Sequence, residues 1–205
     1  MPQRLDSSQP DFEPRFRALL AAKREASVDV ENAVRDIIAD VRRRGDEALI
    51  ELTARYDDLH LTPDTLRVPS DDIEKAFRDT APETRAALEL AHDRIRSHHA
   101  RQMPKDDRYT DAIGAELGSR WTAVESVGLY VPGGAASYPS SVLMNAVPAR
   151  VAGVTRIAMV VPAMRGALNP LVLAAAHIAG VSEIYRVGGA QAVAALAFGT
   201  DTILP

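Results

Sequence analysis

The chain has 205 residues, of which 46% are hydrophobic and 25% charged, a composition typical of a globular protein of one large domain or one and a half ordinary ones. Acidic residues outnumber basic ones by 28 to 24, so no basic excess indicates a nucleic-acid partner. The absence of cysteine excludes disulfides, thiolate metal ligands and thiol catalysis. Because no signal peptide and no apolar run of membrane-spanning length occurs, we expect a cytoplasmic protein without a membrane partner.

Charged residues are concentrated in the first part of the chain, since residues 1–120 hold 45 of the 52. Apolar residues at helical spacing, between capping and stop residues, predict four helices there. They are expected over 28–44, between Ser27 as N-cap and Gly45 as stop, over 46–56 with Asp46 as cap, over 70–77 from Ser70, and over 83–103 behind Pro82. Residues 1–108 are therefore expected to form a charged helical segment.

Residues 109–127 show an alternation of apolar and polar residues that is typical of short, half-buried strands. We expect a connecting hairpin here, which opens an α/β region over 109–205. At Thr202–Leu204 the chain enters another strand-like run, so we expect it to be a truncated sequence that ends within a fold.

After residue 126 the pattern becomes apolar strand, glycine turn and helix, repeated three times. Ala152-Gly153-Val154 recurs 27 positions later as Ala179-Gly180-Val181, each copy ending a helix on a glycine before the next strand. Apolar strands that alternate with helices predict an α/β fold with an incomplete Rossmann-like parallel βαβ sheet. Strands are expected over 127–131, 156–161 and 183–187, and helices over 140–152, 170–179 and 190–198.

Ligands of such sheets bind beyond the carboxyl ends of the strands, so the turns after each strand are candidate sites. In the first turn, Gly133 and Gly134 permit close backbone approach, and Ser140 or Ser141 could present helix N–H groups to a ligand. Alternatively, the same residues form only a tight turn followed by a serine that caps the helix. In the third turn, Gln191 can donate and accept hydrogen bonds to a ligand, or bond to the backbone at the start of its helix.

Other chemistry-bearing groups are sparse. Neither G-x-G-x-x-G nor G-x-S-x-G occurs, and the adjacent His98 and His99 point in different directions on a helix, so they cannot chelate one metal. His177 lies in an apolar helical run and is interpreted as a structural, hydrogen-bonded histidine. No catalytic or metal-ligating residue is assigned within this chain.

Three blocks of the α/β region resemble the histidinol dehydrogenase family. They are Val127-Gly128-Leu129-Tyr130-Val131-Pro132-Gly133-Gly134, Tyr138-Pro139-Ser140-Ser141-Val142-Leu143-Met144-Asn145-Ala146 and Gly188-Gly189-Ala190-Gln191-Ala192. The resemblance implies an NAD-dependent, zinc-requiring enzyme that oxidises L-histidinol through an aldehyde to L-histidine, the last step of histidine biosynthesis, with two NAD molecules taking two hydrides. It also implies a homodimer whose active sites involve both subunits.

The resemblance assigns NAD contacts to Tyr130 and Gln191. It places the zinc ligands, the Glu-His acid–base pair and most substrate contacts at positions after residue 205. The expected chain is therefore an N-terminal fragment that is inactive alone. Two alternatives stay open: a related dehydrogenase of another small hydroxy compound, and a short non-catalytic module that binds a nucleotide or dimerises.

Overall fold

The computed structural model of the chain describes residues 4–133 and 138–205, leaving out the side chains of residues 21–28. Its core is a parallel sheet of order β3-β4-β5, formed by Ser126–Tyr130, Arg156–Val160 and Glu183–Tyr185. The crossovers are α6 (Pro139–Val151) and α7 (Pro170–Ile178), and α8 (Gly189–Phe198) follows the last strand. The predicted α/β fold with a parallel βαβ sheet is confirmed.

Helices cover both faces of this sheet, which explains why its strands are continuous apolar runs. Along β4, Ile157 and Met159 belong to one hydrophobic core, together with side chains of α6 and α7. Ala158 and Val160 point to the opposite core, which contains side chains of α8. The alternation follows from the two-residue side-chain period of a strand.

The charged helical segment packs onto the same sheet. α1 (Phe12–Arg44) and α2 (Asp46–Asp57) contribute to the core beside α8. α4 (Ser70–Asp79) and α5 (Pro82–Ala100) lie on the α6 and α7 side, after the short helix α3 (Pro63–Leu66). Both hydrophobic cores therefore contain residues from before and after position 108. The predicted division of the chain at this position, into a helical segment and an α/β region, stays a prediction.

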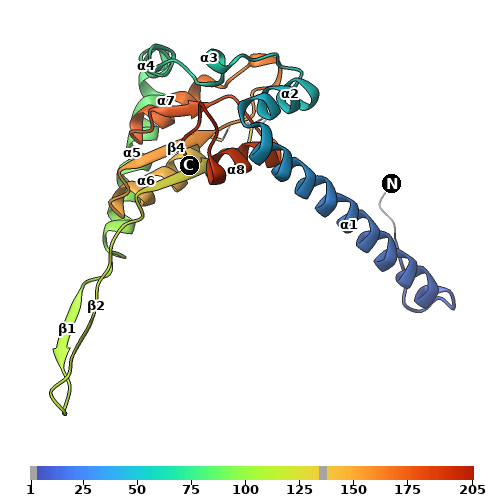
Figure 1. Cartoon of the computed structure of the whole chain (residues 1–205), viewed down its shortest axis with the longest axis horizontal. Helices are drawn as coiled ribbons and strands as arrows, with labels where there is room; N and C mark the ends of the chain where they lie inside the picture. Colours follow the sequence, from blue (N-terminus) through green and yellow to red (C-terminus); the bar gives the residue numbers. More distant parts are fainter. Residues whose placement is uncertain (1–3, 134–137) are drawn as a thin grey trace.

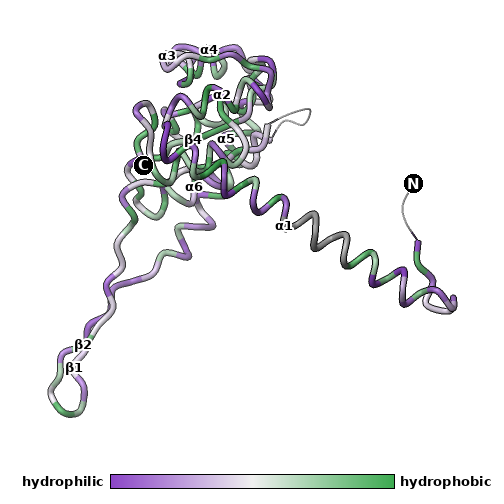
Figure 2. The backbone as a smooth tube through the Cα atoms, turned by 45° about the vertical axis from the view of Figure 1, so that its right-hand side comes forward, coloured by the Kyte–Doolittle hydropathy of each residue, from purple (hydrophilic) through white to green (hydrophobic). Residues whose placement is uncertain are grey.

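Two arms extend from this body (Figure 1). One is the N-terminal part of α1, and the other is an antiparallel hairpin of β1 (Asp107–Thr110) and β2 (Glu116–Ser119). In Figure 2 the hydrophobic segments gather mainly in the body, whereas the arms alternate hydrophilic and hydrophobic colours. Every residue of β1 and β2 is exposed, so the hairpin is confirmed but its predicted half-burial is wrong. The hairpin projects away from the body, so its strands do not pack against the helices there (Figure 1).

Three further predictions about elements are wrong. Asp46 is the first residue of α2, whose N-cap is Gly45, so Asp46 is not the predicted cap. The first helix begins at Phe12, so Ser27 lies inside it and is not its N-cap, although Gly45 does end it with a left-handed φ of +56°. The predicted strand Thr202–Leu204 is instead a series of bends, in which the Thr200 N–H donates to the Ile203 carbonyl at 2.7 Å. Ile203 is fully buried, so its apolar side chain reflects burial in the core rather than pairing of a β-strand.

Candidate functional site

The turns after the three parallel strands pack directly on one another. A Cβ atom at Gly133, after β3, would lie 2.2 Å from the carbonyl oxygen of Pro162, which follows β4. A Cβ atom at Gly188, after β5, would lie 2.5 Å from Cγ of the same proline. Only glycine permits these approaches. The turns thus form one continuous surface at the carboxyl edge of the sheet, where open α/β sheets bind ligands.

Tyr130 and Gln191, the two residues that the family resemblance assigns to NAD, meet around Gly189. The backbone N–H of Gly189 donates to the Tyr130 hydroxyl, with 3.2 Å between nitrogen and oxygen. Gly189 has a φ of +67°, and a Cβ atom there would lie 2.5 Å from Oε1 of Gln191. The Gln191 amide therefore folds back over the start of α8, where its side chain is buried.

This arrangement offers polar groups of both kinds beside an aromatic ring. Tyr130 is 39% exposed, so its ring is accessible to a ligand. The Gln191 amide can donate and accept, and the N-terminus of α8 places further N–H groups nearby. Phenol, amide and backbone N–H groups can hold a nucleotide by hydrogen bonds and ring contact. They supply no carboxylate or imidazole for proton transfer.

The serines of the first turn are less tightly placed. α6 begins at Pro139, so Ser140 and Ser141 lie in its first turn, where Ser140 is exposed. The carbonyl of Ser141 accepts from the Asn145 side chain at 2.7 Å. Gly134 lies outside the described residues. A role for this turn in holding a ligand anion stays a prediction.

The end of α2 also reaches this edge of the sheet, an approach that was not predicted from the sequence. Asp58 forms an exposed ion pair with Arg165 of the second turn, with 3.5 Å between carboxylate oxygen and Nε. Burial raises the pKa of the neighbouring Asp57 carboxyl above its usual range. One oxygen of Asp57 is buried without a hydrogen-bond partner among the described residues. Periodicity gave no signal for this approach, because it depends on how α2 packs in three dimensions.

A groove of about 650 Å³ adjoins the same edge, between α4, the start of α5 and α7. Its wall includes Gly166, from the turn after β4, and Arg186, directly after β5. In the sequence, the charges of α4 are typical of a solvated helix face. Only the packing of α4 against α7 reveals that some of them line a groove.

No metal centre forms among residues 4–133 and 138–205, where no group of three or more histidine, aspartate or glutamate side chains could hold an ion. The described residues thus do not fit a zinc site. His177 is exposed and stacks on Phe77 with ring centroids 4.4 Å apart, so the expected packed histidine instead makes an aromatic contact at the surface. No described helix is both long and apolar enough to cross a membrane.

The chain is similar to known histidinol dehydrogenases. The family model of histidinol dehydrogenase matches residues 20–205. The histidinol dehydrogenase of Brucella abortus strain 2308 is 64% identical over 98% of this chain, and that of Bradyrhizobium diazoefficiens is 64% identical over all of it. These alignments span 47% and 48% of the two relatives, so the chain covers about half their length.

A solved structure gives the same result for the fold. The crystal structure of histidinol dehydrogenase from Elizabethkingia anophelis superposes with a TM-score of 0.81 and 34% sequence identity, over 85% of this chain and 40% of that one. Since the family model matches nearly the whole chain, including all three turns of the candidate site, the chain belongs to the histidinol dehydrogenase family.

Proposed function

We propose that this chain provides NAD-binding turns of a cytoplasmic histidinol dehydrogenase, which oxidises L-histidinol through the aldehyde to L-histidine. One observation carries the proposal: the 3.2 Å contact between the Tyr130 hydroxyl and the Gly189 N–H joins the first turn to the third. The contact brings Tyr130 close to the start of α8, the helix that carries Gln191, and this supports a shared site beyond the carboxyl ends of the strands, where open α/β sheets bind ligands. The family resemblance assigned NAD to the same two residues.

Each residue has a distinct task in this proposal. The Tyr130 ring offers a flat apolar wall to the nucleotide, and its hydroxyl a polar edge. The Gln191 amide donates and accepts at a position fixed by burial, so little side-chain entropy is lost on binding. NAD, when bound, accepts the hydride that leaves the substrate. The chain's own contribution is to bind and orient the cofactor.

Zinc binding and proton transfer are not assigned to the described residues. The resemblance places both at positions after residue 205, and we derive no step of the oxidation through a metal. The proposal therefore predicts that the 205-residue chain alone produces no NADH when it is mixed with L-histidinol, NAD and zinc. Measurable NADH production by the purified chain would contradict the assignment of zinc binding and proton transfer to positions after residue 205.

NAD binding is tested by titrating the ¹⁵N-labelled chain and following its amide resonances by NMR, which detects weak binding and reports folding at once. We expect the Gly189 amide to shift. Gln191→Met and Tyr130→Phe should each weaken binding about tenfold, as for one lost hydrogen bond of about 1.4 kcal/mol. The control is Tyr56→Phe, at an exposed tyrosine of α2. Equal affinity of all four proteins would refute the site.

We also propose that the chain forms a homodimer, with the two arms as contact surfaces. The arms expose large apolar side chains, including Phe16 and Leu20 on α1, and Tyr109 and Leu117 on the hairpin. An isolated two-stranded hairpin is marginally stable in water, so a partner surface would stabilise it. Exposed aromatic residues on projecting elements are typical of protein interfaces.

A further inference from the structure

The second turn begins where the central strand of the parallel sheet ends. The Val161 N–H still donates to the Tyr185 carbonyl of β5, with 3.0 Å between nitrogen and oxygen. Pro162 follows and has no N–H group with which to continue this ladder. The residues on either side of it, Val161 and Ala163, are buried. Pro162 is therefore held in a fixed position at the carboxyl end of β4.

Pro162 separates the first turn from the third. Because β3 and β5 lie on opposite sides of β4, their turns approach the end of β4 from opposite sides. A Cβ atom at Gly133 would lie 2.2 Å from the Pro162 carbonyl oxygen. A Cβ atom at Gly188 would lie 2.5 Å from Cγ and 2.7 Å from Cβ of the same proline. The backbones of both outer turns thus pack against one residue, on its carbonyl and on its ring.

Neither glycine is required by its own backbone conformation. Gly188 is extended, with a φ of −129° and a ψ of −171°, which any residue can adopt. The φ of Gly133 also lies outside the left-handed region. A side chain is excluded at both positions because Pro162 occupies the space that it would need. The separation of the two outer turns is therefore set by this proline.

The hydrogen bond between the outer turns is sensitive to that separation. Tyr130 precedes Gly133 by three positions, and Gly189 directly follows Gly188. The distance of 3.2 Å between the Tyr130 hydroxyl and the Gly189 nitrogen is at the long end of the normal range. Even a small widening of the gap between the turns would break this contact.

We propose that Pro162 is a positioning residue for the NAD site, which sets the separation at which Tyr130 meets Gly189. The inference rests on the proposed function and adds to it a residue that acts through Gly133 and Gly188, without itself touching the cofactor. Holding the two turns at the correct distance before the ligand arrives lowers the entropy lost on binding.

The first test replaces Pro162 with alanine, which can adopt the φ of proline but lacks its ring. Two properties of the ¹⁵N-labelled chain are measured by NMR: the affinity for NAD, and the exchange of the Gly189 amide proton with solvent in the free chain. Pro162→Ala should weaken NAD binding about tenfold and speed this exchange, because the Tyr130 contact no longer protects the amide. The control is Pro170→Ala, at the first residue of α7, which should leave both properties unchanged.

The second test is a rescue. Gly188→Ala should weaken NAD binding at least about tenfold, because the new methyl group meets the Pro162 ring. Adding Pro162→Gly removes that ring, and the alanine methyl group then takes its place between the turns. We expect this double variant to bind NAD within about threefold of the parent chain, as for two residues in direct contact. Pro170→Gly combined with Gly188→Ala is the control and should restore nothing.

The outcomes separate this inference from the proposed function. If Pro162→Ala lowers stability in urea but leaves NAD affinity and Gly189 exchange unchanged, Pro162 serves only the fold, so the inference is refuted and the function stands. If Pro162→Gly does not rescue Gly188→Ala, the loss does not act through their contact, and the inference also fails. If the parent chain binds no NAD, the proposed function fails. Faster Gly189 exchange in Pro162→Ala, reversed in the rescued variant, would then still support the spacing role of Pro162, and unchanged exchange would refute it.

Discussion

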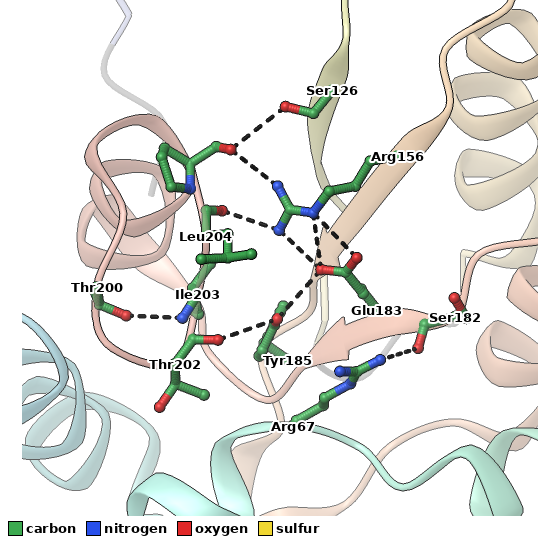
Figure 3. Close-up of polar contacts among 11 residues, drawn as sticks. Arg67, Ser126, Arg156, Ser182, Glu183, Tyr185, Thr200, Thr202, Ile203 and Leu204 are labelled. Atoms are coloured by element: carbon green, nitrogen blue, oxygen red, sulfur yellow. Dashed lines mark hydrogen bonds and ion pairs between the residues drawn. The ribbon is translucent and has the colours of Figure 1, made fainter.

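Arg156 and Glu183, which begin neighbouring parallel strands, form an ion pair with 2.8 Å between Nη2 and Oε2. The same guanidinium donates to the carbonyls of Leu204 and Pro205, each at 3.0 Å (Figure 3). Hydrogen bonding to Glu183 raises the pKa of Arg156, which stays charged. One side chain thus ties the sheet to the segment after α8, at the edge opposite the candidate site.

Replacing Arg156 with methionine should lower the free energy of unfolding by about 2 kcal/mol. The variant keeps most of the apolar stem but leaves the Glu183 carboxylate and two carbonyl groups without their donor. Urea unfolding followed by circular dichroism measures the change. The control is Arg35→Met, which removes an exposed pair with Glu31 within α1 and should have little effect, as exposed pairs of this type contribute little. Equal stability losses in both variants would show that the Arg156 contacts have no special role.

Asp57→Asn should stabilise the protein at pH 7 but not at pH 3. Burial raises the folded-state pKa of Asp57 above the ordinary value of 3.8, so the folded state binds the proton more tightly than the unfolded one. The carboxyl therefore lowers stability as the pH rises through and beyond that value. Asparagine removes the buried charge, and melting temperatures at the two pH values measure the gain. Asp29→Asn, at an exposed position of α1, is the control. A gain of equal size at both pH values would contradict the linkage.

The parallel sheet was predictable because its signal is local. Strands such as Ile157–Val160 are apolar on both faces, and Gly153 and Gly180 end the preceding helices with left-handed φ values. Tyr130 and Gln191 came from the family resemblance together with the rule that ligands bind beyond strand ends. What the letters could not show is that both side chains meet at Gly189, since that contact joins residues 59 positions apart.

The remaining errors have physical causes outside the local pattern. Ser27 is a good capping residue, but the helix continues through it from Phe12, because a cap acts only where the backbone leaves the helix. Leu117 fits strand alternation, yet the hairpin projects away from the body and leaves it exposed. The groove depends on α4 packing against α7, and no periodicity within α4 encodes that neighbour.

Gly189→Ala should both destabilise the protein and weaken NAD binding. Alanine at a φ of +67° is strained by about 1 kcal/mol, and its Cβ atom would meet the Gln191 side chain at 2.5 Å. Gly114→Ala is a matched control, because Gly114 has a φ of +88° but a Cβ atom there would meet no atom of the described residues within 4 Å. It should show the backbone strain alone, in urea unfolding, and leave NAD binding unchanged. Identical NAD affinities of the two variants would mean that the Gln191 position is not critical.

The dimer proposal predicts that one face of the hairpin, and not the other, mediates self-association. Tyr109 and Leu117 are directly paired across the strands, and so are Thr110 and Glu116 on the opposite face. Changing both Tyr109 and Leu117 to serine should raise the dimer dissociation constant at least about tenfold, because buried aromatic anchors dominate interface energies. Sedimentation velocity over a concentration series measures this. The control, Thr110→Ser, should associate like the parent chain. A parent chain that stays monomeric at every concentration, or a double variant that dimerises as well as the parent, would exclude this face of the hairpin as the contact.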